Sequence, residues 1–382
     1  MTRVAVRSAA LLAAAQRLSL GAEELRAQGE SVGGALTRCR SPGVATVGDL
    51  GLLAAWVRLE GDGLRLVGPA GLWGEALALD ALAVRLRVAA RAYAEVEEAA
   101  ASVLAGVHSG ADAAGRAGLF EESGAHPVLR RVAPTWSPAP VQRPADLVAL
   151  GEGLDGGRVR VVEVADPGGG SAWVVAVPGT QTWSPRAGAN PFDLTADVRS
   201  VTGDATLAAA GVTAALDAAM RASARRRGVG AARVAGEPVL LVGHSQGGIH
   251  AAAIAADPDF GSTHRVTHVL TTGAPVGVFA VPERVRVLSV EHADDPVPTL
   301  DLTPNPARAS WLTLRVGDGP ATDPGRHALG EYESTVRAAQ DAPRGTVPGL
   351  AGWEVSAAAF LRRPVRSVNE VAIERGWQNP RP

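Results

Sequence analysis

The sequence Gly243-His244-Ser245-Gln246-Gly247 directly follows the apolar run Pro238–Val242. This run and the alanine-rich stretch Ile249–Ala256 after the motif predict a buried strand, a sharp turn and a helix. In that context G-x-S-x-G is the pattern of a nucleophile elbow, which presents a serine at the carboxyl end of a strand. Glycine at both ends of the motif leaves room for the strained turn. We therefore expect an α/β fold in which Ser245 is a nucleophile.

A serine hydroxyl needs a base and an orienting acid, and in folds with this elbow they follow in the order serine, acid, histidine. The alternating segment Val285–Val290 predicts a strand that runs into Glu291-His292-Ala293-Asp294-Asp295. Asp294 and Asp295 are both candidates for the acid. His327 is the only histidine beyond them, and it lies where a loop leads into a helix. The order therefore predicts His327 as the base.

An oxyanion hole needs two hydrogen-bond donors aimed at the charge that develops on the substrate. One donor is the backbone N–H of the residue after the nucleophile, which is Gln246. The second donor comes from a loop after an earlier strand. The apolar segment Trp173–Val177 predicts that strand, and Thr180 lies in the loop Pro178–Trp183. We expect Thr180 to donate through its N–H, its hydroxyl or both.

These three segments together resemble the class 3 lipase branch of the α/β-hydrolases. The family elbow is G-H-S-x-G, and its oxyanion loop R-G-S/T corresponds here to Pro178-Gly179-Thr180, with proline in place of arginine. The family acid lies in N-D-x-V-P. Alignment with Asp294-Asp295-Pro296-Val297-Pro298 favours Asp295 as the triad acid.

The chain also resembles a group of uncharacterised actinobacterial hydrolases. Their shared runs P-G-T-Q, N-P-F-D, V-G-H-S-Q-G-G, V-T-H-V and E-H-x-D-D-x-V-P recur here from Pro178, Asn190, Val242, Val266 and Glu291. The resemblance covers roughly residues 140–340. It implies an α/β-hydrolase fold and its site, and hardly anything about substrate.

Composition narrows the classes of partner and cofactor. The formal net charge is −2 and the chain has no lysine, so a nucleic-acid partner is not expected. The abundance of Ala, Gly and Arg is typical of a GC-rich genome rather than of phosphate binding. The single cysteine, Cys39, excludes an intrachain disulfide and a cysteine metal cluster. The chemistry of a serine triad requires no metal and no organic cofactor.

The first 133 residues are expected to be helical. Apolar residues from Leu77 to Val107 recur at spacings of three and four. Trp73-Gly74 precedes Tyr93 and Glu97, which are four residues apart. This resembles the WXG100-type helical hairpins of type VII secretion, although the W-x-G tripeptide is absent. A secretion partner could recognise these side chains, and the alternative is a cap or dimerisation module.

The remaining organisation follows from composition. Prolines predict a linker at 134–142, followed by an α/β-hydrolase domain at 143–365 and a C-terminal tail at 366–382. No segment is expected to approach the apolar length of a membrane span.

The N-terminus resembles a weak signal peptide, but the helical spacing of its leucines favours a folded first helix. Two locations are compatible with this sequence: the protein stays in the cytoplasm, or it is exported by a route that needs no signal peptide.

The favoured function is hydrolysis of a small-molecule or lipid carboxylic ester. Two alternatives are acyl transfer to an alcohol by the same triad, and a non-catalytic, secretion-linked protein that acts through its helices. The segment after the oxyanion loop mixes apolar and charged residues, which is unlike an apolar lid. An acyl pocket for short or medium chains is expected from Val276, Val278, Phe279 and Val281.

Overall fold

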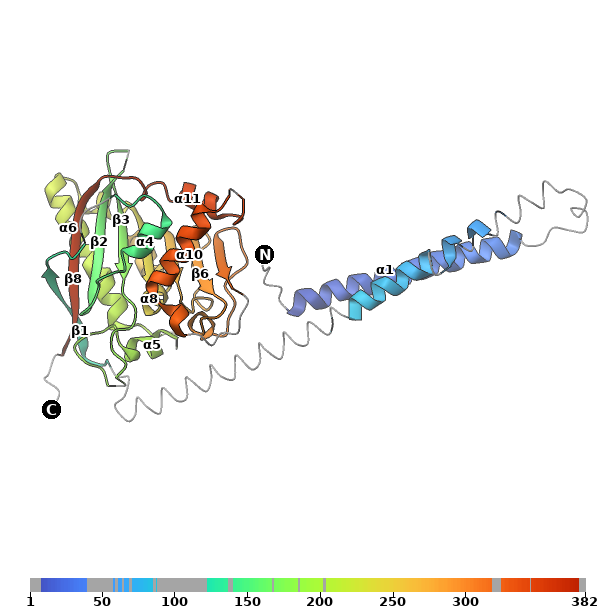
Figure 1. The fold of residues 1–382 in the computed structure, drawn as a ribbon, viewed down its shortest axis with the longest axis horizontal. Helices are drawn as coiled ribbons and strands as arrows, with labels where there is room; N and C mark the ends of the chain where they lie inside the picture. The colour runs from blue at the N-terminus through green and yellow to red at the C-terminus, as the bar shows by residue number, and fades with distance from the viewer. Residues whose placement is uncertain are drawn as a thin grey trace, which may run out of the picture. The chain divides into compact units, whose positions relative to one another are not determined.

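The computed structural model describes residues 8–39, 58, 61–63, 65–68, 71–84, 87, 122–136 and 140–377, without 167, 185, 202–203, 318–323 and 344. The chain divides into two units. One is Val6–Ala99, and the other comprises Ala100–Pro382 with the first five residues (Figure 1). The smaller unit is helical where it is described, and the larger unit is built on a β-sheet.

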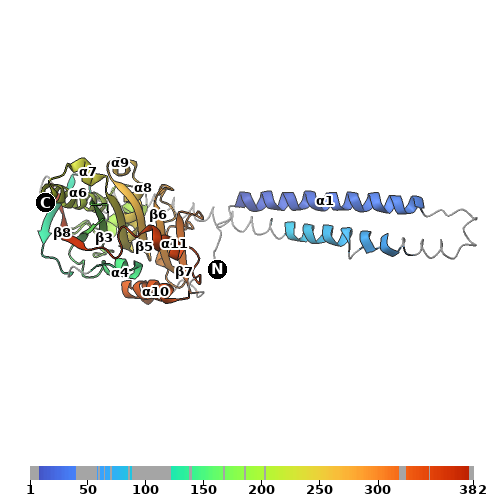
Figure 2. The ribbon, with the colours of Figure 1, turned by 90° about the horizontal axis from the view of Figure 1, so that it is seen from above.

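The helical unit pairs α1 (Ser8–Cys39) with the helical segment Gly61–Val84 (Figure 2). Small side chains let the two helices approach closely, and Ala15, Ala22, Ala76 and Ala83 are fully buried. A Cβ added to Gly29 would lie 3.1 Å from the Trp73 ring nitrogen. An ion pair between Arg26 and Asp80 also joins the helices. The prediction of a folded first helix is therefore confirmed.

The segment Gly61–Val84 is long and apolar enough to cross a membrane by length and composition. The expectation that no segment approaches a membrane span does not hold for this helix. Helices packed in protein cores and signal sequences meet the same criteria, so the finding assigns no membrane location. Tyr93, Glu97 and most of the helix expected to continue to Val107 lie outside the described residues.

An eight-stranded, mostly parallel sheet forms the larger unit, in the order β1-β8-β2-β3-β4-β5-β6-β7. The strands from β3 to β7 are parallel, whereas β1, β8, β2 and β3 pair antiparallel. The consecutive strands β2 and β3 form an antiparallel hairpin. The strands are β1 (Ala125–Val132), β2 (Arg158–Ala165), β3 (Ser171–Val177), β4 (Pro238–His244), β5 (Arg265–Thr272), β6 (Arg286–His292), β7 (Trp311–Val316) and β8 (Val365–Trp377).

Helices cover both faces of this sheet (Figures 1 and 2). The alternation along β3 shows the two cores: Trp173 and Val175 belong to one, and Val174 and Ala176 to the other. Both faces of the central strands are buried, which explains their continuous apolar runs. The first face is covered by α5 (Leu194–Val201), α6 (Leu207–Arg227), α7 (Ala231–Ala235), α8 (Gln246–Ala256) and α9 (Pro258–Thr263), and the second by α4 (Pro144–Ala149), α10 (Leu329–Asp341) and α11 (Leu350–Ser356).

The expected domain boundaries need correction at both ends of the sheet unit. Residues 125–132, assigned to the helical region, form strand β1, and residues 366–377, assigned to a tail, belong to β8. The backbone N–H of Thr135, in the expected linker, donates to Glu370 on β8 at 3.0 Å. Charged residues interrupt the apolar pattern of these two strands, and they are paired in the fold: Glu370 on β8 accepts from Arg160 on β2 at 2.9 Å.

We predict that deleting residues 366–382 prevents folding, because β8 lies between β1 and β2 and pairs with both. Deleting only 378–382 should leave the fold intact, since β8 ends at Trp377. Circular dichroism and urea unfolding of both truncated chains provide the measurement. A cooperative unfolding transition in the shorter chain would show that β8 is dispensable.

Candidate active site

The turn at Ser245 is strained and tightly packed. Ser245 has φ 55° and ψ −127°, which L-residues rarely adopt. A Cβ on Gly243 would lie 2.1 Å from the Gly247 carbonyl carbon, and a Cβ on Gly247 would lie 2.2 Å from the Val177 oxygen. Only glycine therefore fits at these two positions. The turn sets Ser245 between the end of β4 and the start of α8.

Three predicted residues meet in one chain of hydrogen bonds. The Ser245 Oγ lies 2.9 Å from His327 Nε2, and His327 Nδ1 lies 2.8 Å from Asp295 Oδ2. They come from the loops after β4 and β6 and from the short 3-10 helix η3 (Pro324–His327). Asp294 points elsewhere, and its Oδ2 lies 3.2 Å from the Arg326 Nε. The structure thus brings Asp295, rather than Asp294, to the histidine.

The Asp295 carboxyl group has donors on both oxygens and is held as an anion. Its side chain is fully buried. Burial by itself raises the pKa of Asp295, but hydrogen bonds from His327, Tyr332 and the Val297 N–H outweigh this effect and hold the pKa below its ordinary value. The Val297 N–H donates to Oδ1 at 2.9 Å, and the Tyr332 hydroxyl donates to Oδ2 at 2.6 Å. Sequence reasoning missed Tyr332, because only the docking of α10 brings it to the acid.

His244, inside the elbow, is a neighbour of the base. Its ring centroid lies 4.7 Å from that of His327. Burial and the adjacent His327 lower the pKa of His244 to about 3, so the ring stays uncharged at neutral pH. Its Nδ1 lies 3.2 Å from the Thr272 hydroxyl oxygen. His244 therefore packs beside the base and hydrogen-bonds to β5.

The loop after β3 lies against the nucleophile. A Cβ on Gly179 would be 3.3 Å from the Ser245 Cβ, so this backbone approaches the serine closely. The Thr180 hydroxyl donates to Asp197 on α5 at 2.9 Å. Gln246 is the first residue of α8, where backbone N–H groups have no partner within the helix. Both predicted oxyanion donors therefore belong to segments that flank Ser245.

A buried arginine from β8 holds the segment that follows this loop. Arg375 is ion-paired with Asp193 at 2.9 Å and with Glu122 at 2.5 Å. The Asp193 carbonyl accepts from the Gln246 side-chain amide at 2.7 Å. Sequence reasoning missed this network, because it joins residues that are far apart in the chain. It links strand β8 to the residue after the nucleophile.

The four predicted acyl-pocket residues have different environments. Val276 and Val281 are buried in the core that α6 and α8 cover, and Phe279 packs against that core. Val278 is exposed to 38%. The first two side chains are thus core residues, because the loop after β5 also completes the hydrophobic core. Contact of these four residues with a substrate stays a prediction.

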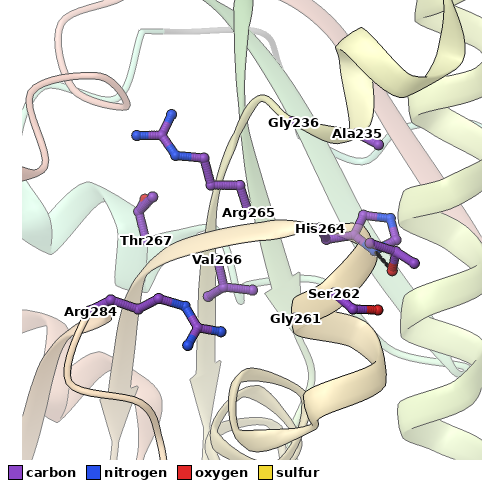
Figure 3. A pocket seen from close by; sticks show the side chains of 10 residues that line it. Ala235, Gly236, Gly261, Ser262, His264, Arg265, Val266, Thr267 and Arg284 are labelled. Atoms are coloured by element: carbon purple, nitrogen blue, oxygen red, sulfur yellow. Dashed lines mark hydrogen bonds between the residues drawn. The ribbon is translucent and has the colours of Figure 1, made fainter.

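A cavity of about 400 Å³ lies at the opposite, amino edge of the strands (Figure 3). It is lined by residues just before β4, at the start of β5 and before β6, including Arg265 and Arg284. None of the predicted site residues lines it. Among the described residues, no group of three or more His, Cys, Asp or Glu side chains could hold a metal ion.

Comparison with protein-family models gives no match for this chain, and comparison with curated proteins gives no significantly similar sequence. What the site can do therefore follows from its own residues and their arrangement. A serine, a histidine and a carboxylate in line can perform nucleophilic catalysis on an acyl group.

We predict that Asp197 makes stability depend on pH. Burial raises the pKa of Asp197 from 3.8 to about 6 in the folded protein, although hydrogen bonds from Thr180 and Gln246 oppose this effect. The folded state thus keeps a proton that the unfolded chain releases. The resulting stabilisation is complete below about pH 4 and is lost as the pH rises through about 6.

Asp197→Asn stays neutral, so its unfolding free energy should fall less than that of the wild type between about pH 4 and 6.5. Urea unfolding across this pH range measures the difference. Asp259→Asn, at an exposed position, controls for the loss of one carboxylate. Equal pH dependence in the wild type and Asp197→Asn would contradict the assignment.

Proposed function

We propose that this chain is a serine hydrolase of the α/β-hydrolase type that cleaves carboxylic esters through an acyl-enzyme. The observation that carries the proposal is the hydrogen-bonded series Ser245–His327–Asp295, with separations of 2.9 and 2.8 Å. This arrangement matches the roles of nucleophile, base and orienting acid in a triad. The chain order serine, acid, histidine supports the same assignment.

Each residue then has a defined step. The Ser245 Oγ attacks the ester carbonyl carbon while His327 Nε2 takes the hydroxyl proton. His327 returns that proton to the leaving alcohol, and the acyl group stays on Ser245. A water molecule, deprotonated by His327, then releases the acid and restores the serine. Asp295 holds the Nδ1–H tautomer and stabilises the imidazolium that forms in each half-reaction.

The backbone N–H groups of Gln246 and Thr180 are proposed to bind the oxyanion of the tetrahedral intermediate. The Thr180 hydroxyl donates to Asp197 and is therefore occupied when that carboxylate is charged. We thus assign the oxyanion contribution of Thr180 to its backbone. The hydrogen bond to Asp197 holds the loop in place beside Ser245.

The mostly parallel sheet supports assignment to the α/β-hydrolase type. The nucleophile follows β4, which lies inside the sheet, and the acid follows β6 at the same edge. In open α/β sheets, ligands bind outside the carboxyl ends of the strands. The position of the triad agrees with this general rule.

We predict that Ser245→Ala abolishes hydrolysis of p-nitrophenyl butyrate without loss of the fold, because only the attacking hydroxyl is removed.

Asp295→Asn should lower kcat on the order of a thousandfold or more, because the asparagine no longer holds His327 in the required tautomer. Asp294→Asn is the matched control and should have a much smaller effect, because Asp294 contacts Arg326 rather than His327. The measurement is kcat for ester hydrolysis by each of the three purified variants, compared with the wild type. A reversed ranking of the two aspartates would move the acid to Asp294.

We further predict a preference for short or medium acyl chains without interfacial activation. The half-buried Leu194 and Val198 on α5 are separated by Asp197 and followed by Arg199, so α5 offers no continuous apolar face for a lipid surface. Rates for p-nitrophenyl esters of increasing chain length, measured through the solubility limit, test this. A sharp increase in rate when droplets form, with long chains preferred, would contradict the prediction.

A further inference from the structure

Tyr332 donates to the same carboxylate oxygen that His327 uses. Its hydroxyl lies 2.6 Å from Asp295 Oδ2, and His327 Nδ1 lies 2.8 Å from that atom. The Tyr332 side chain is fully buried on α10, which begins two residues after His327. One carboxylate oxygen of Asp295 therefore accepts two hydrogen bonds, one from His327 and one from Tyr332.

The position of the tyrosine is fixed from several sides. Its ring stacks on His292 with centroids 4.0 Å apart and an interplanar angle of 8°. His292 is held at both ring nitrogens, by the Arg326 carbonyl and the Thr335 hydroxyl, each at 2.8 Å. A Cβ on Gly273 would lie 2.8 Å from the Tyr332 ring, so glycine there makes room for the phenol. The hydroxyl is thus aimed at Asp295 by packing.

We propose that Tyr332 is a positioning residue that sets the strength of the hydrogen bond between Asp295 and His327. This inference rests on the proposed function of the triad. A phenol that donates to a carboxylate oxygen withdraws charge from it and makes it a weaker acceptor for a second donor. Tyr332 therefore lowers the basicity of His327, and it fixes the rotamer of the acid at the same time.

The other charged and titratable groups around this pair are identifiable. His244 is adjacent to both rings, with centroids 4.7 Å from His327 and 5.6 Å from Tyr332. Glu291 precedes His292 on β6 and is paired with Arg315. On η3, Arg326 is paired with Asp294 and Glu331. Burial lowers the pKa of His244 to about 3, and burial with the Asp295 hydrogen bond raises that of Tyr332.

The test is the pH profile of ester hydrolysis by the full chain carrying Tyr332→Phe. Without the phenol hydroxyl, Asp295 holds the imidazolium more strongly. The acid limb of the profile, which is the low-pH side where kcat/KM rises with pH, should thus move to higher pH by about half a unit to one unit. Ser334→Ala removes a different hydroxyl from α10, at an exposed position, and should leave the limb unchanged. An unchanged limb in Tyr332→Phe, or a shift to lower pH, would overturn the proposal.

A second measurement does not depend on the variant folding. The chain has only two tyrosines, so incorporation of 3-fluorotyrosine changes few positions. The fluorinated phenol is a stronger donor and should move the acid limb to lower pH, opposite to Tyr332→Phe. A limb that stays in place or moves upward in the fluorinated protein would also refute the role of Tyr332.

A third readout separates the two proposals. The low-field proton resonance of the His327 Nδ1–H requires no activity, and it should move downfield in Tyr332→Phe and upfield with 3-fluorotyrosine. If the wild type hydrolyses no ester, the proposed function fails, while these shifts still test Tyr332. If the wild type is active but neither the resonance nor the limb moves, only the role of Tyr332 fails.

Discussion

The close contact of backbone at residues 243–247 is the constraint on which the rest of the site depends. Ser245 takes a backbone conformation that side-chain residues rarely adopt, and Gly243 and Gly247 have no room for a Cβ. A strained backbone conformation of this kind persists only where contacts with the surrounding structure hold it in place. Here β3, β4 and β5 supply those surroundings: the Ser245 N–H donates to the Thr272 carbonyl at 2.9 Å, and the Val177 carbonyl lies against Gly247.

Buried charges connect this turn to β8 and to Glu122, just before β1. Arg375 on β8 ties Asp193 and Glu122 together, and Asp193 in turn accepts from the Gln246 side chain. Losing one partner of such a buried pair is costly, because it leaves an uncompensated charge. The C-terminal strand is therefore part of the support of the site, although it lies far from Ser245 in the sequence.

The sequence predicted those features that are local or fixed by order. The strand, turn and helix around Ser245 are contiguous, and His327 is the only histidine after the acid, so both could be identified without coordinates. Strands β1 and β8 could not, because charged residues such as Arg130, Glu370 and Arg375 interrupt their apolar pattern and are paired only with residues distant in the sequence. Tyr332 was missed for a similar reason, because the docking of a helix distant in the sequence brings it to Asp295.

The central claim is that Ser245 is a nucleophile activated by His327, and covalent labelling tests it most directly. The intact protein would be treated with a fluorophosphonate and the modified peptide identified by mass spectrometry. The account predicts one adduct per chain, on Ser245, and much slower labelling in a His327→Ala variant. An adduct on another residue, no adduct, or equally fast labelling without His327 would contradict it.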